Sequence, residues 1–72
     1  MEDLKSYLVI FKIRVRSQYL NEGAWDERTE EEEFTCFPSE LPSKIYTAKR
    51  RIQVRIEWYE HSEVTVVQIF NL

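Results

Sequence analysis

Apolar and polar residues alternate along three stretches of the chain, and this two-residue period predicts β-strands. In residues 52–58 the apolar side chains fall on one side of a strand and the polar side chains fall on the other. A second run rich in apolar and β-branched residues, 64–70, follows across a short polar segment. These two runs therefore predict an antiparallel hairpin that turns near residues 60–63.

A first hairpin is predicted over residues 4–37. Its first strand runs from residue 4 to about residue 19, with apolar residues at the odd positions 7–15 on one face. The opposite face carries Leu8 and Ile10, followed by basic residues at positions 12, 14 and 16. Gly23, the only glycine, supplies the turn at residues 21–23. The register that places Phe11 opposite Phe34 also sets basic residues against glutamates on the outer face.

A short helix is predicted between the two hairpins, beginning after Ser39, which is a good N-cap residue. Its apolar face comprises Leu41, Ile45, Ala48 and Ile52. A helix continued past residue 52 would keep Ile56 on this face but would turn Val54 and Trp58 away. A strand collects all the apolar residues of 52–58 on one side, and its β-branched residues favour that interpretation.

The predicted fold is therefore α+β, a single domain of residues 1–72 in the order ββαββ. It consists of a small four-stranded antiparallel sheet, made of two hairpins, with one short helix between them. Two alternatives stay open. Residues 44–59 could form one long strand in an all-β meander, or the sheet could curl into a small barrel.

Composition narrows the classes of function. With a single cysteine and a single histidine, the chain has neither an internal disulfide nor a cysteine-rich metal site. His61 and Ser62 fall in a predicted turn, so we expect no enzyme activity, no metal and no cofactor. The lone thiol and the lack of a leader or a spanning segment predict a cytoplasmic protein. Because a core this small gives little stability by itself, we also expect copies of the chain to associate with one another.

Charge is concentrated in residues 22–33, where seven acidic residues stand against Arg28 alone. Trp25 lies within this acidic block, and an aromatic residue with a charged rim is typical of a protein interface. An alternative is that Trp25 packs on Leu20 across the turn. Both terminal strands are also apolar on two faces, which predicts a surface that a partner or a second copy covers.

The predicted function is a small protein-binding module, an acidic inhibitor or adaptor that docks on a protein with a basic surface. In size and charge, though in no motif, the chain is similar to the small host-directed inhibitors that phages encode. The predicted contact residues are Trp25, Glu22, Asp26, Glu27, Glu30 and Glu31, with Val64, Val66 and Phe70 as a second region. One alternative is a module that contacts RNA or DNA through a small basic cluster that is expected to be free of acidic partners, namely Lys49, Arg50, Arg51 and Arg55. Another is a structural subunit of a larger assembly.

Overall fold

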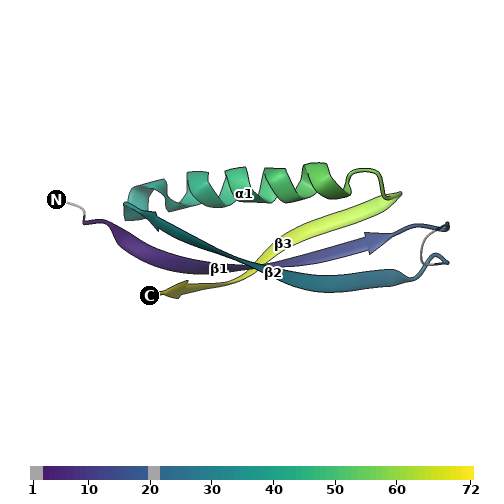
Figure 1. Ribbon diagram of the computed structural model, residues 1–72, viewed down its shortest axis with the longest axis horizontal. Helices are drawn as coiled ribbons and strands as arrows, with labels where there is room; N and C mark the ends of the chain where they lie inside the picture. The colour runs from purple at the N-terminus through teal and green to yellow at the C-terminus, as the bar shows by residue number, and fades with distance from the viewer. Residues whose placement is uncertain (1–2, 20–21) are drawn as a thin grey trace.

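The computed structural model describes residues 3–19 and 22–72, which form one antiparallel sheet with a helix along one face (Figure 1). In chain order the elements are β1 (Lys5–Arg16), β2 (Trp25–Cys36), the 3-10 turn η1 (Pro38–Glu40), α1 (Leu41–Ile56) and β3 (His61–Asn71). The strand order across the sheet is β2-β1-β3, so β1 is central. The molecule is long and thin, with extents of 52 × 18 × 11 Å.

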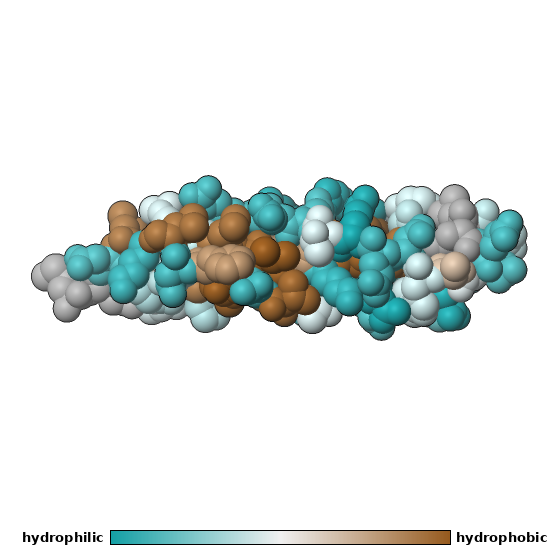
Figure 2. Space-filling view, turned by 90° about the horizontal axis from the view of Figure 1, so that it is seen from below, coloured by the Kyte–Doolittle hydropathy of each residue, from teal (hydrophilic) through white to brown (hydrophobic). Residues whose placement is uncertain are grey.

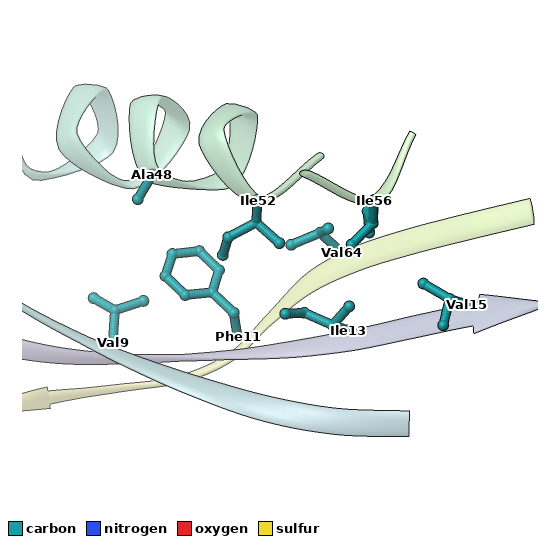
Figure 3. Close-up of a cluster of buried hydrophobic side chains, with 8 residues drawn as sticks. All are labelled: Val9, Phe11, Ile13, Val15, Ala48, Ile52, Ile56 and Val64. Carbon is teal, nitrogen blue, oxygen red and sulfur yellow. The ribbon is translucent and has the colours of Figure 1, made fainter. Parts of the chain in front are cut away.

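The core is built on β1. The odd-numbered residues from Tyr7 to Val15 are all buried, whereas the even-numbered residues between them are half-buried. This confirms the prediction of which β1 side chains share a face. Ala48, Ile52 and Ile56 project from α1 onto that face (Figure 3). The whole buried cluster comprises Val9, Phe11, Ile13 and Val15 of β1, Ala48, Ile52 and Ile56 of α1, and Val64 of β3.

The helix α1 continues to Ile56, so the prediction of a strand over residues 52–58 is wrong. Ile52 and Ile56 are one helical turn apart and both are buried against β1, while Val54 and Trp58 are exposed. Contact with β1 therefore determines the helical conformation of this segment, although its β-branched residues favour a strand. Among the described residues the sheet has three strands, not four. The predicted ββαββ order is wrong, and so are the all-β alternatives.

The hairpin between β1 and β2 has a longer connection than predicted. Phe11 lies opposite Glu30, so the predicted pairing of Phe11 with Phe34 is wrong. Within the connection the Gly23 N–H donates to the Ser17 carbonyl oxygen at 3.2 Å, and Gly23 has a φ of 81°, which glycine adopts without strain. Residue 21, part of the predicted turn, lies outside the described residues. The observed register of β2 against β1 differs from the predicted register by an even number of residues, so each β2 side chain keeps its predicted face.

The strand β3 contains a β-bulge opposite the middle of β1. Phe11 pairs with Val66, but the neighbouring Ile10 pairs with Gln68, so Val67 is an extra residue in β3. Each residue beyond the bulge therefore lies on the opposite face from the one that uninterrupted alternation assigns to it.

The bulge separates residues that alternation places on one face. Val64 is buried in the core beneath α1, and Val66 packs against that core. Phe70 lies opposite Leu8, on the face of the sheet away from α1. The expectation that Val64, Val66 and Phe70 form one exposed surface is therefore wrong for the two valines.

Two substitutions separate the helix from the predicted strand. Val54 is 54% exposed, so Val54→Ala should leave the free energy of unfolding unchanged or raise it by up to about 0.6 kcal/mol, because alanine favours a helix. Ile52 is 4% exposed, so Ile52→Ala should lower the free energy of unfolding by about 2–5 kcal/mol. Urea denaturation monitored by circular dichroism measures both. A loss of about 2 kcal/mol in Val54→Ala would contradict the helix.

Candidate functional site

The face of the sheet opposite α1, here called the open face, is not covered by any element that the structure describes (Figure 1). Its side chains follow from the strand pairing, since directly paired residues of antiparallel strands project to the same side. Across the sheet the open face reads in rows from β2 through β1 to β3. The rows are Glu33, Leu8 and Phe70; Glu31, Ile10 and Gln68; Thr29, Lys12 and Thr65; Glu27, Arg14 and Glu63; and Trp25, Arg16 and His61.

The half of the open face nearer the chain termini is apolar. Figure 2 shows hydrophobic side chains gathered in this half and mainly hydrophilic side chains in the other. We call Leu8, Ile10 and Phe70 the apolar patch. Leu8 and Ile10 are half-buried by their neighbours, and Phe70 is 39% exposed. The helix α1 lies on the other side of the sheet, so the exposed part of each of these side chains faces solvent (Figure 1).

The other half of the open face is charged, and its charges pair with one another. The Arg14 Nε lies 2.8 Å from the Glu27 carboxylate, an ion pair without hydrogen-bond geometry, and the Arg14 Nη1 lies 3.3 Å from Glu63. Lys12 lies 3.5 Å from the same Glu27 carboxylate. Because these groups neutralise one another within the sheet, this half offers little net charge to a ligand.

Trp25 is held at the end of this charged half. The guanidinium carbon of Arg14 lies 4.5 Å from the centre of the Trp25 ring and that of Arg16 lies 5.4 Å from it, both within cation–π range. His61 lies on the far side of the same row, 6.4 Å from Trp25 between ring centres. The alternative packing on Leu20 involves a residue outside those the structure describes. Trp25 remains exposed in this position.

Four consecutive glutamates of β2 divide into two chemically different pairs. Glu30 and Glu32 face α1, where they form ion pairs with Arg55 and Arg51. Glu31 and Glu33 face the other way, beside Ile10 and Leu8. Both are exposed, and no ion pair joins either of them to a basic group among the described residues. The apolar patch therefore has two uncompensated carboxylates along one side.

The predicted acidic contact region is likewise divided between the two faces of the sheet, because successive strand residues project to opposite sides. Trp25, Glu27 and Glu31 lie on the open face, Asp26 and Glu30 lie on the face toward α1, and Glu22 lies in the connection before β2. The structure therefore does not bring the predicted set together as one surface. Leu8 and Ile10 join Phe70 instead, through the pairing of β1 with β3.

The basic residues of α1 are also divided. Arg51 and Arg55 point to β2 and are paired with glutamates, which overturns the expectation of a basic cluster free of acidic partners. Arg50 lies on the other flank of α1, where its Nη1 donates to the Gln53 side-chain oxygen at 3.2 Å. Lys49 is half-buried on the same helix. Pairing removes much of the local positive charge that phosphate contact requires.

The single cysteine and the single histidine lie at opposite ends of the sheet. Cys36 is buried and pairs with Lys5 at one end of the sheet, whereas His61 pairs with Arg16 at the other end. A nucleophile and its base must lie within hydrogen-bonding distance, so these two residues cannot act together. In the described ranges no group of three or more histidine, cysteine, aspartate or glutamate residues is placed to hold a metal ion.

Comparison of the chain with protein-family models, with curated proteins and with solved structures finds no match. In the part of the chain that the structure describes, no helix combines the length and the apolar character needed to cross a membrane.

The ion pairs between β2 and α1 can be measured by a double-mutant cycle on Arg55 and Glu30. Their side chains are 55% and 34% exposed, so we expect a coupling energy of only about 0.2–1 kcal/mol. It should weaken in about 1 M salt, where the screening length is about 3 Å. A matched cycle on Arg50 and Glu30, which form no ion pair, should give a coupling near zero. Equal coupling in the two cycles would contradict the assigned ion pair.

Proposed function

We propose that the chain is a non-enzymatic protein-binding module that docks on a partner through the apolar patch of the open face. The single observation that carries this proposal is the uncovered patch itself, in which Leu8, Ile10 and Phe70 adjoin across paired strands. Exposed apolar patches on small proteins commonly mark interaction sites, because water is removed from them when a partner binds.

The surroundings of the patch indicate the chemistry of the partner. Glu31 and Glu33 line the β2 side of the patch, and they are not compensated by basic groups of the described chain. A matching surface would present apolar side chains at its centre and lysine or arginine opposite these two carboxylates. Complementary charge of this kind raises the association rate and fixes the orientation of the complex. An acidic inhibitor or adaptor that occupies a basic surface fits this description.

The charged half of the open face should contribute less to partner binding than the apolar patch does. Its arginines are already engaged by Glu27, Glu63 and the ring of Trp25, so a partner would have to replace existing interactions to use them. Trp25 can still contribute at the rim, since it is exposed and its position is fixed by two arginines. We therefore expect the partner to contact mainly the apolar patch and its two glutamates.

Capture of partners by the immobilised chain tests this proposal. Phe70→Ser and, on a different strand, Leu8→Thr should each weaken capture of the same partner about tenfold or more, because they remove apolar contacts at the centre of the interface. The double variant Glu31→Lys and Glu33→Lys should also weaken capture, most strongly at low salt. The partner retained by the wild-type chain is identified by mass spectrometry and its affinity is then measured with the purified protein.

A matched control removes an exposed aromatic residue from the opposite side of the molecule. Tyr46 lies exposed on α1, so Tyr46→Ser should leave the affinity unchanged. Circular dichroism of each variant verifies that the fold is intact. The proposal fails if folded Phe70→Ser and Leu8→Thr bind the partner as tightly as the wild type, or if Tyr46→Ser abolishes binding.

A further inference from the structure

The two edge strands of the sheet differ in how they are protected. Seven of the twelve residues of β2 are charged, and charge on an edge strand opposes pairing with another chain. In β3, by contrast, no charged side chain occurs from Val64 to Asn71. This segment also contains neither proline nor glycine, and most of its residues are β-branched or aromatic. The outer edge of β3 thus lacks the charges and the proline that oppose pairing, and the bulge at Val67 is the feature that interrupts its regularity.

Apolar residues are exposed on both faces of this edge. Val67 is 50% exposed at the bulge and Ile69 is 45% exposed on the side of α1, while Phe70 belongs to the apolar patch of the open face. The chain exposes 5241 Å² in total, compared with about 4,800 Å² expected for a folded monomer of 8.8 kDa. The excess follows from the elongated shape, whose extents are 52 × 18 × 11 Å.

We propose that the outer edge of β3 pairs antiparallel with β3 of a second copy, so that two chains form one continuous six-stranded sheet. This inference goes beyond the proposed function and does not rest on it, because it uses the edge of the sheet rather than the open face. A second copy is the occupant that the charges favour: β3 against β3 brings two uncharged segments together. Pairing of β2 with β2 would set Glu30–Glu33 against the same glutamates.

Symmetry also favours this pairing. Two copies of β3 related by a two-fold axis would satisfy one another's backbone hydrogen-bonding groups. Only the acidic β2 edges would then remain unpaired, at the two ends of the joined sheet. Pairing of β3 with β2 of another copy would be head-to-tail, and it would continue into an open filament because each added copy leaves another β3 unpaired. The charged β2 edge acts against that arrangement.

The position of the two-fold axis follows from the faces of the side chains. An axis between Val67 and Gln68 pairs the whole uncharged segment 64–71 with itself. It sets Val66 opposite Ile69 of the second copy, and both of these side chains lie on the side of α1. A shift of either strand by one residue would pair side chains on opposite faces. In this register Val67 of one copy lies diagonally across from Val67 of the other.

A charge placed at Val67 tests the pairing. Sedimentation from about 1 μM to about 1 mM protein, a range that spans ordinary dimer affinities, should show a monomer–dimer equilibrium for the wild type. Val67→Lys should raise the dimer dissociation constant about tenfold or more, because two lysines then repel one another near the axis. Val67→Glu should do the same. An equimolar mixture of the two variants should restore the dimer, because each lysine then faces a glutamate.

Thr35→Lys is the matched control, since it places the same charge on the exposed β2 edge, opposite the uncharged Ser6, and should leave the dimer unchanged. Circular dichroism of each variant monitors folding, and Ile69→Lys replaces Val67→Lys if that variant unfolds. Hydrogen exchange should show concentration-dependent protection in β3 and none in β2. A wild type that stays monomeric, open polymers, a fully dimeric Val67→Lys, or no recovery on mixing would each overturn the proposal.

Discussion

Burial of one face of β1 beneath α1 is the interaction on which the rest of this chain depends. The alternating residues of β1 form its apolar face, and Ala48, Ile52 and Ile56 of α1 pack against that face (Figure 3). Because β1 is the central strand, this contact also fixes β2 and β3 on either side of the core. One helix can cover only one face of a sheet, so the construction of the core leaves the second face in water. The surface available for recognition is thus a consequence of how a short chain folds.

The parts of the fold that local periodicity determines could be predicted from the sequence. The two faces of β1, the end of β2 before Pro38 and the start of the helix all follow from patterns within a few residues. Residues 52–58 could not be assigned in this way. Their alternation satisfies a strand, while Ile52 and Ile56 also satisfy a helix, and only the distant contact with β1 distinguishes the two. The helix therefore reflects tertiary packing that overrides local propensity.

The candidate site was predictable only in part, because non-local interactions determine its composition. Phe70 was identified from its place in an apolar strand, but it was assigned to the face of Val64 and Val66. The adjacent apolar residues Val66 and Val67, where the alternation breaks, are the signal of the bulge that separates Phe70 from them. The acidic run of β2 was evident, yet its division was not. Glu30 can occupy the side of the core because Arg55, far along the chain, reaches it. Which carboxylates are neutralised inside the protein and which stay exposed depends on the register of two strands.

The bulge at Val67 makes the length of β3 as important as its composition. Side chains alternate between the two faces of a strand, so one inserted residue moves every later side chain to the opposite face. Loss of Val67 would remove the bulge and leave Ile69 opposite Val9 and Phe70 opposite Leu8, whereas one further inserted residue beside a retained bulge would exchange the sides of Ile69 and Phe70. Related chains should therefore tolerate loss of the bulge residue, and conservative replacements along this strand, better than insertion of a further residue.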